Sequence, residues 1–396
     1  MSQLKVNAIR HTGASSDAVT LASDGTATAI LTEVSNGQLG RRNIITNGSM
    51  MISQRSTSVS VSATGYHALD RWKASLDLPS GVSNYTFSQE TDAPTGFAAS
   101  FKITPNQARS GALSGSDRVF IQTKIEAQDI RASGWDYTNS NKYLTCSFYI
   151  KSNLTGVVGV EFYAGDTGGS YDSYNQTVTI NSADTWERKS VKIYGNSNLV
   201  FNNDNGEGLS LTLHFMDGPN FTSGTLTTGS WHDGTTANRG SSSNIDITSS
   251  ASNYVSFTGV QLEVGDMTKF EHRSYGDELR SCYRYFYMHA VGSEGENSGK
   301  APLCSGAMYN DTNFFGTIQF PVKMRTRPSL HEVSGTDHYR VWGGNGSDAC
   351  NDCAHQDSSP NAWTINLYDG LGLTASAGAF ASTNNTSTEI GFEAEL

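Results

Sequence analysis

Apolar and polar residues alternate with a period of two through most of residues 43–272. This is the period of a β-strand with one buried face. Strand-like runs include 143–150, 158–162, 209–215 and 254–264, and clusters of Gly, Asn and Asp separate them. Many short strands between such turns predict an antiparallel sandwich or jelly roll. In the clearest run one face holds Leu209, Leu211, Leu213 and Phe215, and Ser210, Thr212 and His214 are expected to point outward.

The composition excludes several other classes of protein. No run approaches the roughly 20 apolar residues that a membrane span requires, and residues 1–16 lack the apolar core of a secretory signal. Collagen-like and heptad repeats are absent from the sequence. The chain has 17 Tyr, 17 Phe and 6 Trp, which supply large apolar side chains and argue against disorder. We therefore expect an all-β protein with two or three domains.

The formal net charge is −11, so a nucleic-acid partner is not expected. The densest basic segments are Arg41-Arg42 and the alternating Lys323, Arg325 and Arg327, which are interpreted as solvated or ion-paired side chains. Any glycan that this chain recognises is expected to be read by hydrogen bonds and ring stacking, because the chain's overall negative charge would repel an anion.

Changes in pattern divide the chain into four parts. Residues 1–40 contain a hairpin signal at Asp24-Gly25 and are too short to bury a core, so they are expected to pair with other copies or to dock on a partner. Residues 41–273 form the predicted sandwich. Ser274 and Asp277 resemble a capping box, and the spacing that follows predicts a helix over 275–288, within a linking segment 274–289. Residues 290–396 are predicted to form a smaller β-sandwich.

Several motifs of this chain resemble the tail-fibre and receptor-binding proteins of bacteriophages, of the short-tailed or marine phage type. The resemblance covers roughly residues 1–290 and is most specific near residues 259–276. The motifs are Asn43–Gly48 (NIITNG), Ile52–Arg55 (ISQR), Tyr66–Trp72 (YHALDRW), Ile125–Asp129 (IEAQD), Ser147–Ser152 (SFYIKS), Gly259–Gly265 (GVQLEVG) and Phe270–Gly276 (FEHRSYG).

The resemblance implies a homotrimeric virion appendage that is assembled in the host cytoplasm and becomes part of the tail. Residues 1–40 would attach it to the tail or to a neighbouring fibre protein, and the C-terminal domain would contact a host cell-surface polysaccharide. The sandwich of this family looks like carbohydrate-binding jelly rolls. Two other functions remain open: a structural virion protein, such as a head fibre or an adaptor between tail and fibre, and a glycan depolymerase.

The motif residues also have structural interpretations. Arg55 or Arg71 is expected to pair with Asp70 or Glu126 inside the sandwich. The cluster 271–273 (Glu-His-Arg) is interpreted as a cap for the following helix or as a polar contact between subunits.

The sequence gives little indication of enzymatic chemistry. It contains no β-helix repeat and no phosphate-binding loop, and Gly111–Gly115 is not the strand-to-helix turn of a serine hydrolase. Acidic pairs for glycoside hydrolysis cannot be located from sequence. We expect a non-enzymatic protein with no catalytic residue and no cofactor.

Five cysteines occur, and an odd count in a protein assembled in a reducing cytoplasm argues against a disulfide framework. Cys146 and Cys282 are expected to be buried. Cys350, Cys353 and His355 are weak candidates for zinc ligands, because a second Cys pair is missing; a loop disulfide or two free thiols are the alternatives. Residues 203–207 are rich in oxygen ligands for calcium, but a plain Asn-Gly turn is favoured.

Sugar binding needs exposed aromatic rings for stacking and polar side chains for the hydroxyl groups. The last domain is the best such region, and Trp231 with His232 and Asp233 is a second candidate. The alternative is that Trp342 and Trp363 are core residues. The candidate glycan-binding residues are Tyr339, Trp342, Asp348, Asp352, Trp363 and Tyr368.

Overall fold

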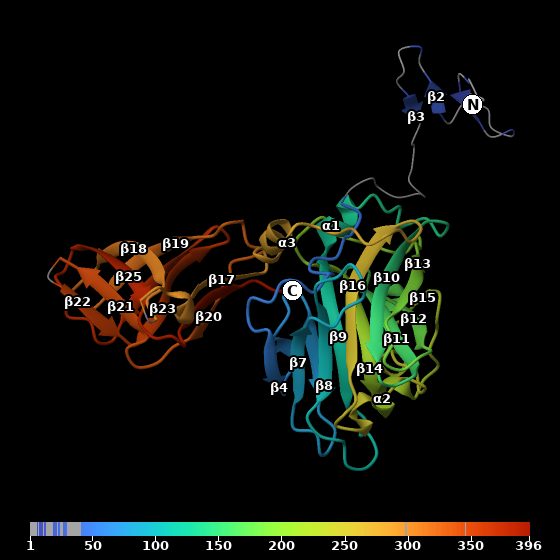
Figure 1. The fold of residues 1–396 in the computed structure, drawn as a ribbon, viewed down its shortest axis with the longest axis horizontal. Helices are drawn as coiled ribbons and strands as arrows, with labels where there is room; N and C mark the ends of the chain where they lie inside the picture. Colours follow the sequence, from blue (N-terminus) through green and yellow to red (C-terminus); the bar gives the residue numbers. More distant parts are fainter. Residues whose placement is uncertain are drawn as a thin grey trace, which may run out of the picture.

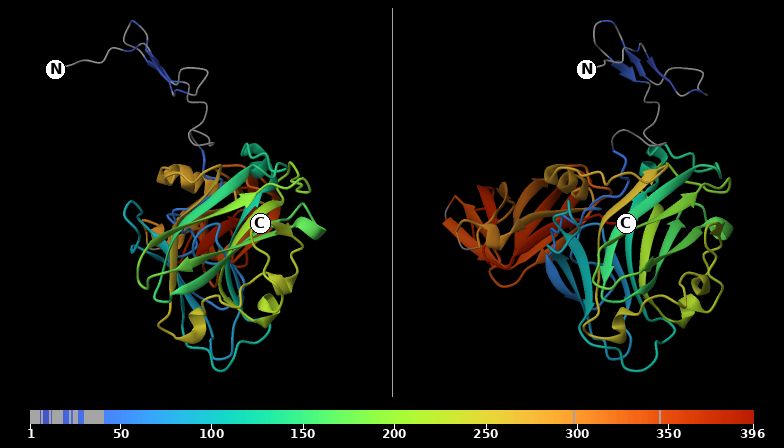
Figure 2. Two further views of the ribbon diagram at one scale, coloured as in Figure 1. Left: turned by 90° about the vertical axis from the view of Figure 1, so that its right-hand side faces the viewer. Right: turned by 45° about the vertical axis from the view of Figure 1, so that its right-hand side comes forward.

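The computed structural model describes residues 41–297, 299–344 and 346–396, together with residues 6, 8–10, 12, 19–21, 23 and 27–29 of the N-terminal part. The described chain is all-β, as predicted, with three short α-helices. It forms a large jelly-roll-like sandwich and a smaller C-terminal β unit, which lie side by side with helix α3 between them (Figures 1 and 2).

The large sandwich consists of two antiparallel sheets. The six-stranded sheet has the order β13 (Glu187–Tyr194), β10 (Tyr143–Ser152), β16 (Val255–Val264), β8 (Ser100–Pro105), β7 (Tyr85–Glu90) and β4 (Ser58–Val61). The seven-stranded sheet has the order β15 (Trp231–His232), β12 (Ser173–Ile180), β11 (Gly156–Ala164), β14 (Glu207–Asp217), β9 (Arg118–Glu126), β6 (Lys73–Asp77) and β5 (Gly65–Tyr66). Helix α1 (Ala127–Ala132) follows β9 directly.

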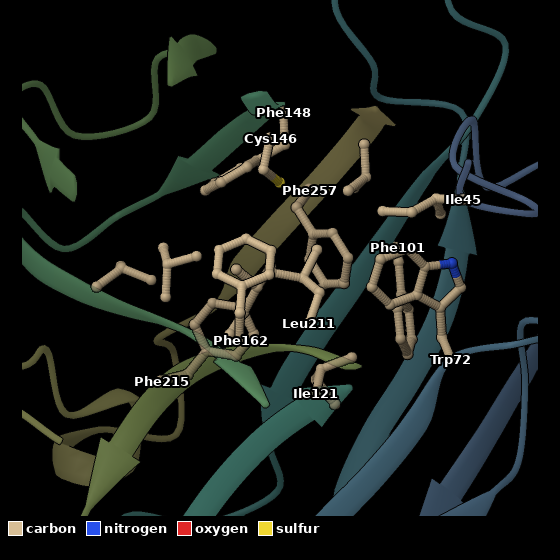
Figure 3. Packing of buried hydrophobic residues seen from close by; sticks show 14 of the residues in the cluster. Ile45, Trp72, Phe101, Ile121, Cys146, Phe148, Phe162, Leu211, Phe215 and Phe257 are labelled. Atoms are coloured by element: carbon tan, nitrogen blue, oxygen red, sulfur yellow. The ribbon is translucent and has the colours of Figure 1, made fainter. Parts of the chain in front are cut away.

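The core lies between these sheets, where the apolar side chains of one sheet pack against those of the other (Figure 3). Cys146 and Phe148 of β10 are fully buried, as are Leu211 and Phe215 of β14. Phe257 of β16 lies at the centre, where it packs edge-on against the Trp72 ring. The period of two therefore predicted this core correctly, because each strand presents alternate residues to one face.

The expectation that Ser210, Thr212 and His214 point outward into solvent was wrong. They lie on the outer side of the sheet, but all three are buried. The segment 218–254 folds back over this part of the sheet and carries α2 (Pro219–Thr222) and two short 3₁₀ turns. A long connection can cover a sheet face, and the period within a strand does not report such a cover.

The predicted helix over 275–288 is shorter in the structure. Helix α3 spans Tyr275–Cys282, and the Ser274 hydroxyl accepts the Asp277 backbone N–H at 3.2 Å, as the capping-box pattern predicted. Residues Phe286–Val291 form strand β17 instead of the last helical turns, because they pair with β26 (Glu389–Glu393) of the C-terminal unit. The pairing of distant segments overrides the local helical spacing.

The C-terminal unit therefore begins with β17 and contains two sheets. The smaller sheet has the order β17, β26 and β20 (Ser329–Val333). The larger sheet, called the curved sheet below, has the order β22 (Gly346–Cys350), β21 (Tyr339–Gly343), β25 (Gly378–Thr383), β18 (Pro302–Met308), β19 (Phe314–Gln319), β24 (Ala362–Tyr368) and β23 (Asp352–Ser359).

A single residue shows how strongly the curved sheet bends. Asn351 alone joins β22 to β23, which are the two edges of the sheet. One residue spans at most about 3.6 Å, so the sheet curves until its two edges approach each other at this point. One face therefore points inward, where its buried side chains join the core with those of the smaller sheet, and the other points outward to solvent.

The N-terminal segment contains three short antiparallel strands, β1 (Ala8–Ile9), β2 (Val19–Leu21) and β3 (Ala27–Ala29). Leu21 pairs with Ala27, which agrees with the predicted hairpin. The Asp24-Gly25 turn itself and residues 30–40 lie outside the described residues.

The junction between the two β units contains many of the motif residues. Arg71 forms an ion pair with Glu395 and stacks over the Tyr285 ring, with its guanidinium carbon 3.5 Å from the ring centroid. Arg55 stacks over the Phe286 ring at 3.6 Å and lies 3.3 Å from a Glu395 carboxylate oxygen. The expected pairing of Arg55 or Arg71 with Asp70 or Glu126 was therefore wrong.

Those two carboxylates have other partners at the same junction. Glu126 accepts two hydrogen bonds of 2.6 Å from the Arg284 guanidinium and one of 2.7 Å from the Tyr285 hydroxyl. Asp70 accepts from Gln54, whose side-chain amide also donates to the Phe286 carbonyl at 2.8 Å. Motifs far apart in the sandwich sequence thus converge on the start and the end of the C-terminal unit.

Residues 271–273 hold the entry and exit of the sandwich together. Glu271 accepts the Asn43 backbone N–H at 2.9 Å, and Arg273 donates to the Asn43 carbonyl. Arg273 also lies 3.6 Å from Glu278 of α3. This arrangement agrees with a role in fixing the helix, which was one of the two interpretations of the cluster.

Candidate functional site

The outward face of the curved sheet is the candidate functional site. The residues on this face can be identified because alternate residues of a strand point to opposite faces. Phe314 is buried and Phe315 is not, and Ala381 is buried whereas Phe380 is half exposed. Trp342 is the direct cross-strand partner of Phe380, so both side chains leave the same face. The same face carries Ser305, Thr317, Arg340, Thr364, Asn366 and Ser382.

Two pairs of stacked aromatic rings lie on this face. The rings of Trp342 and Phe380 are 4.8 Å apart between centroids and nearly parallel, at 6°. The rings of Tyr309 and Phe315 are 4.9 Å apart, at 11°. Phe380 is 50% exposed and Tyr309 is 68% exposed, so each of these large apolar side chains leaves much of its surface in contact with water. Each pair therefore presents an apolar platform to solvent.

The two platforms belong to neighbouring parts of the sheet. Phe380 lies on β25 and Phe315 on β19, and only β18 separates these strands. Two inter-strand spacings are about 10 Å. A ligand longer than a single ring can therefore contact both platforms across the serine and threonine side chains between them.

A hollow of about 410 Å³ lies beside the Trp342–Phe380 platform. Pro302 and Ser382 form part of its wall, and Asn297 and Lys300 come from the segment that precedes β18. The Lys300 side chain is exposed, and none of the described residues pairs with it. The platform thus lies next to polar groups able to bind a hydroxyl or an anionic group.

Arg340 is held in place on the same strand as Trp342. Its Nε donates to the Asn384 side-chain carbonyl at 2.9 Å, and one terminal nitrogen donates to the Ser347 hydroxyl at 3.1 Å. Both partners are neutral, so neither supplies a counter-charge to Arg340. Its cross-strand partner is Ser382, which lines the hollow.

The structure separates the six predicted glycan-binding residues. Tyr339 is fully buried, and its hydroxyl donates to Glu332 at 3.0 Å. Trp363 is 4% exposed and packs in the inner core. Neither ring can stack on a sugar, because both have the inward parity of the curved sheet. These two are core residues, the alternative that the sequence left open for Trp363.

The other predicted residues are divided between the faces. Trp342 lies in the outward platform. Asp348 is cross-strand partner to the buried Val341 and accepts the Gly372 backbone N–H at 2.8 Å, so it supports a loop. Asp352 and Tyr368 are cross-strand partners on β23 and β24 and point outward, but neither lines the hollow beside Trp342.

The second candidate region, around Trp231, does not present a ring to solvent. Trp231 is 6% exposed, packs against Tyr174, and donates from its indole N–H to the Tyr194 carbonyl at 2.6 Å. His232 lies 3.1 Å from the Asn175 amide. This region forms the edge of the large sandwich.

The sequence did not single out Phe380, Tyr309 or Phe315. Phe380 lies in a small-residue segment, Gly378–Thr383, where a large exposed ring is anomalous. That anomaly was a usable signal. The Trp342–Phe380 stacking was not, because β21 and β25 are distant in sequence and only the tertiary structure places them side by side. Tyr309 and Phe315, in contrast, face each other across the hairpin between the consecutive strands β18 and β19.

All five cysteines are free thiols. Burial raises the pKa of the Cys350 thiol to about 12 and also raises that of Cys353. His355 is on the surface, within 3.0 Å of Arg327 and of Ser358. Within the described ranges, no group of three His, Cys, Asp or Glu residues is placed to hold a metal ion.

Residues 203–207 form a turn at the domain junction. Asp204 accepts the Gly206 backbone N–H at 2.9 Å, and Glu207 pairs with Lys124. The Asn205 amide bonds to the Arg325 carbonyl of the C-terminal unit. The oxygen-rich residues are thus engaged in protein contacts.

A larger cleft, of about 920 Å³, lies between α1, α3 and residues 322–323. It contains cationic and anionic side chains together, including the paired Arg273 and Glu271. Its aromatic residue, Tyr285, is buried beneath Arg71. Its other ring is the imidazole of His272, so it offers no exposed Trp, Tyr or Phe ring among the described residues.

Comparisons with known proteins give similarity of fold. No family model matches the chain, and no curated protein matches it. Similar solved structures include the enzymatically active domain of tailspike protein 4 from bacteriophage CBA120, at 11% identity over 56% of this chain and 21% of that chain, with a TM-score of 0.26. The match thus spans about a fifth of the length of that tailspike chain.

Carbohydrate-binding modules are also among the similar structures. The family 11 module of a Clostridium thermocellum cellulosomal cellulase is 10% identical over 55% of this chain and 98% of its own, with a TM-score of 0.25. A xylan-binding domain from Paenibacillus barcinonensis is 12% identical over 53% of this chain and 94% of its own, with a TM-score of 0.24. No helix within the described ranges is long and apolar enough to cross a membrane.

Proposed function

We propose that this chain is a receptor-binding protein of a bacteriophage tail fibre, which attaches the virion to a host cell-surface polysaccharide. The observation that carries the proposal is the outward face of the curved sheet, with its two exposed aromatic platforms among hydroxyl, amide and cationic side chains. The phage assignment is supported by the motif resemblance in residues 1–290.

Sugar rings suit such a face for a physical reason. A pyranose has an apolar side of C–H groups, which packs on an aromatic ring, and an equatorial belt of hydroxyl groups, which need hydrogen-bond partners. Trp342 and Phe380 supply the flat apolar surface, and Asn297, Lys300 and Arg340 supply polar groups near it. A rigid sheet holds these groups in place before binding, which lowers the entropic cost of association.

We further propose that the protein is a homotrimer and not an enzyme, that it is assembled in the host cytoplasm, and that it becomes part of the virion tail through residues 1–40. Glycoside hydrolysis needs two carboxylates flanking the scissile bond. The hollow beside Trp342 is lined by no Asp or Glu of the described chain, which supports binding without cleavage at this face.

The test is adsorption of virions that carry Trp342→Ala to host cells. We expect loss of adsorption with normal particle assembly, because the variant removes the ring under Phe380 and leaves the inner core untouched. Tyr275→Ala is the matched control, since Tyr275 is 58% exposed on α3 and has no stacking partner among the described rings. It should adsorb normally.

Other outcomes would identify the rival functions. Failed assembly of Trp342→Ala particles, or unchanged adsorption, would favour a structural head fibre or adaptor. New reducing ends after incubation of the protein with host polysaccharide would favour a depolymerase.

A further inference from the structure

The charges around the Trp342–Phe380 platform differ from those of the chain as a whole. The chain has 38 Asp and Glu against 27 Lys and Arg. The hollow beside the platform has one lysine, Lys300, in its lining and no carboxylate among the described residues there. Glu296 precedes Asn297 in sequence but does not line the hollow. The lining of this recess therefore carries a positive charge although the chain as a whole is acidic.

A second cation lies on the same side. Arg340 is two residues from Trp342 on β21, and residues two apart in a strand share a face at a distance of about 7 Å. Its two hydrogen-bond partners, Asn384 and Ser347, do not neutralise it. In this respect Arg340 differs from Arg71 and Arg284 at the domain junction, which are both paired with carboxylates.

Local charges decide what this recess attracts. At physiological ionic strength the Debye length is about 8 Å, so the chain's distant carboxylates are screened at the recess. Lys300 lines the hollow, and Arg340 lies two residues from Trp342 on the same strand, so both are closer to the platform than those carboxylates and are screened less. The overall charge of −11 therefore does not exclude an anionic ligand at this point.

We propose that the recess binds an acidic sugar, with its ring stacked on the Trp342–Phe380 platform and its anionic substituent facing Lys300 and Arg340. This inference rests on the proposed function and specifies its ligand class, an acidic surface polysaccharide. The shared chemistry is an anionic group on a pyranose, which a uronate carboxylate or a sulfate ester can supply.

The experiment measures binding of the full chain to paired oligosaccharides by calorimetry at two salt concentrations. Galacturonate, alginate and hyaluronate oligosaccharides are each compared with their carboxyl-reduced forms, and chondroitin sulfate with unsulfated chondroitin. We expect the acidic member of at least one pair to bind more tightly, and added salt to weaken that member more. The pair that responds identifies carboxylate or sulfate as the source.

Substitutions separate charge from stacking. Lys300→Gln and Arg340→Gln should each weaken the acidic ligand about 2- to 5-fold, the range of exposed ion pairs, and leave its neutral counterpart unchanged. Trp342→Ala should weaken both. Lys323→Gln is the matched control, because Lys323 is exposed in the other cleft and should have no effect.

The results distinguish this inference from the proposed function. Equal binding of acidic and neutral members, or no binding of any acidic member, overturns the acidic-ligand inference. If Trp342→Ala still abolishes adsorption in that case, the proposed receptor-binding function stands without it. If binding is acid-selective but Trp342→Ala leaves it unchanged, the anionic ligand binds elsewhere and the inference fails.

Discussion

Arg71 is the residue on which most of the domain junction depends. Its side chain is 2% exposed and that of Glu395 is 4% exposed. Its guanidinium also donates to the Lys124 carbonyl, and the nearby Tyr66 hydroxyl donates to the Leu396 carbonyl at 2.9 Å. Burial raises the pKa of the nearby Asp70 carboxyl to about 6. A buried charge is tolerated here only because each partner is present.

Glu395→Gln should therefore destabilise the protein strongly. The variant leaves Arg71 buried without a counter-charge, and breaking one side of a buried ion pair costs about 3–5 kcal/mol. We expect a lower urea midpoint and faster proteolysis at the junction. Glu393→Gln is the control, because Glu393 is 35% exposed and 3.6 Å from Arg55; its cost should stay below about 1 kcal/mol. Equal effects of the two variants would contradict the assignment.

At the scale of elements, the cover formed by residues 218–254 depends on a buried charge network. His214 Nδ1 lies 2.9 Å from Asp217, and its Nε2 lies 3.3 Å from Glu161. Arg239, carried by the cover, donates to Glu161 at 2.7 and 2.9 Å. Burial alone would lower the pKa of His214, but the two carboxylates outweigh it and raise that pKa to about 9. The cover is thus fastened to the sheet by ionised groups.

The stability of this cover should decrease at both high and low pH. His214 has a folded pKa above its ordinary 6.5, so its contribution is complete below pH 6.5 and is lost as pH rises toward 9. Burial tends to raise the pKa of Glu161, but His214 and Arg239 lower it to about 2, so its contribution is lost as pH falls from 4.5 toward 2.

Hydrogen exchange of residues 218–250 measures this dependence. After correction for intrinsic rates, protection should be greatest between pH 4.5 and 6.5 and should fall above and below that window. In His214→Gln the fall between pH 6.5 and 9 should disappear, because the side chain no longer titrates. Protection that stays constant from pH 6.5 to 9 in the unaltered protein would contradict the network.

The elements also show what a sequence pattern can predict. The strands of the large sandwich follow from their period of two, because one buried face suffices to define them. Phe286 fitted a helical face, but its strand pairing with β26 depends on residues about 100 positions away. Trp342 and Trp363 both lie in strands, and only the pairing with Phe380 in one case and the inner core in the other shows which ring is exposed.

The described part of the molecule consists of two β units joined through a polar junction, and of three short N-terminal strands (Figure 1). The small N-terminal strands bury little surface, which is too little for independent stability. A segment of this kind is stabilised when several copies associate. This favours the proposed oligomer.

Light scattering of the full chain at micromolar concentration tests that proposal. A homotrimer should have a mass of about 128 kDa, three times the 42.6 kDa of one chain. The mass should not fall on dilution through the range used for adsorption. A mass of one chain at these concentrations would exclude the trimer and leave the glycan-binding face to act singly.

The Arg71–Glu395 pair also has a consequence for the nascent chain, because its two residues are synthesised at different times. The two residues are 324 positions apart, and ribosomes add about 5–20 residues per second, so Glu395 follows Arg71 by roughly 15 to 65 s. Once β16 has been made and the large sandwich can fold, its Arg71 guanidinium stays without this counter-charge until Glu395 is added. A nascent chain that stops short of residue 395 keeps this unpaired buried charge, so it should unfold more readily and be a better substrate for proteases than a chain that extends past it.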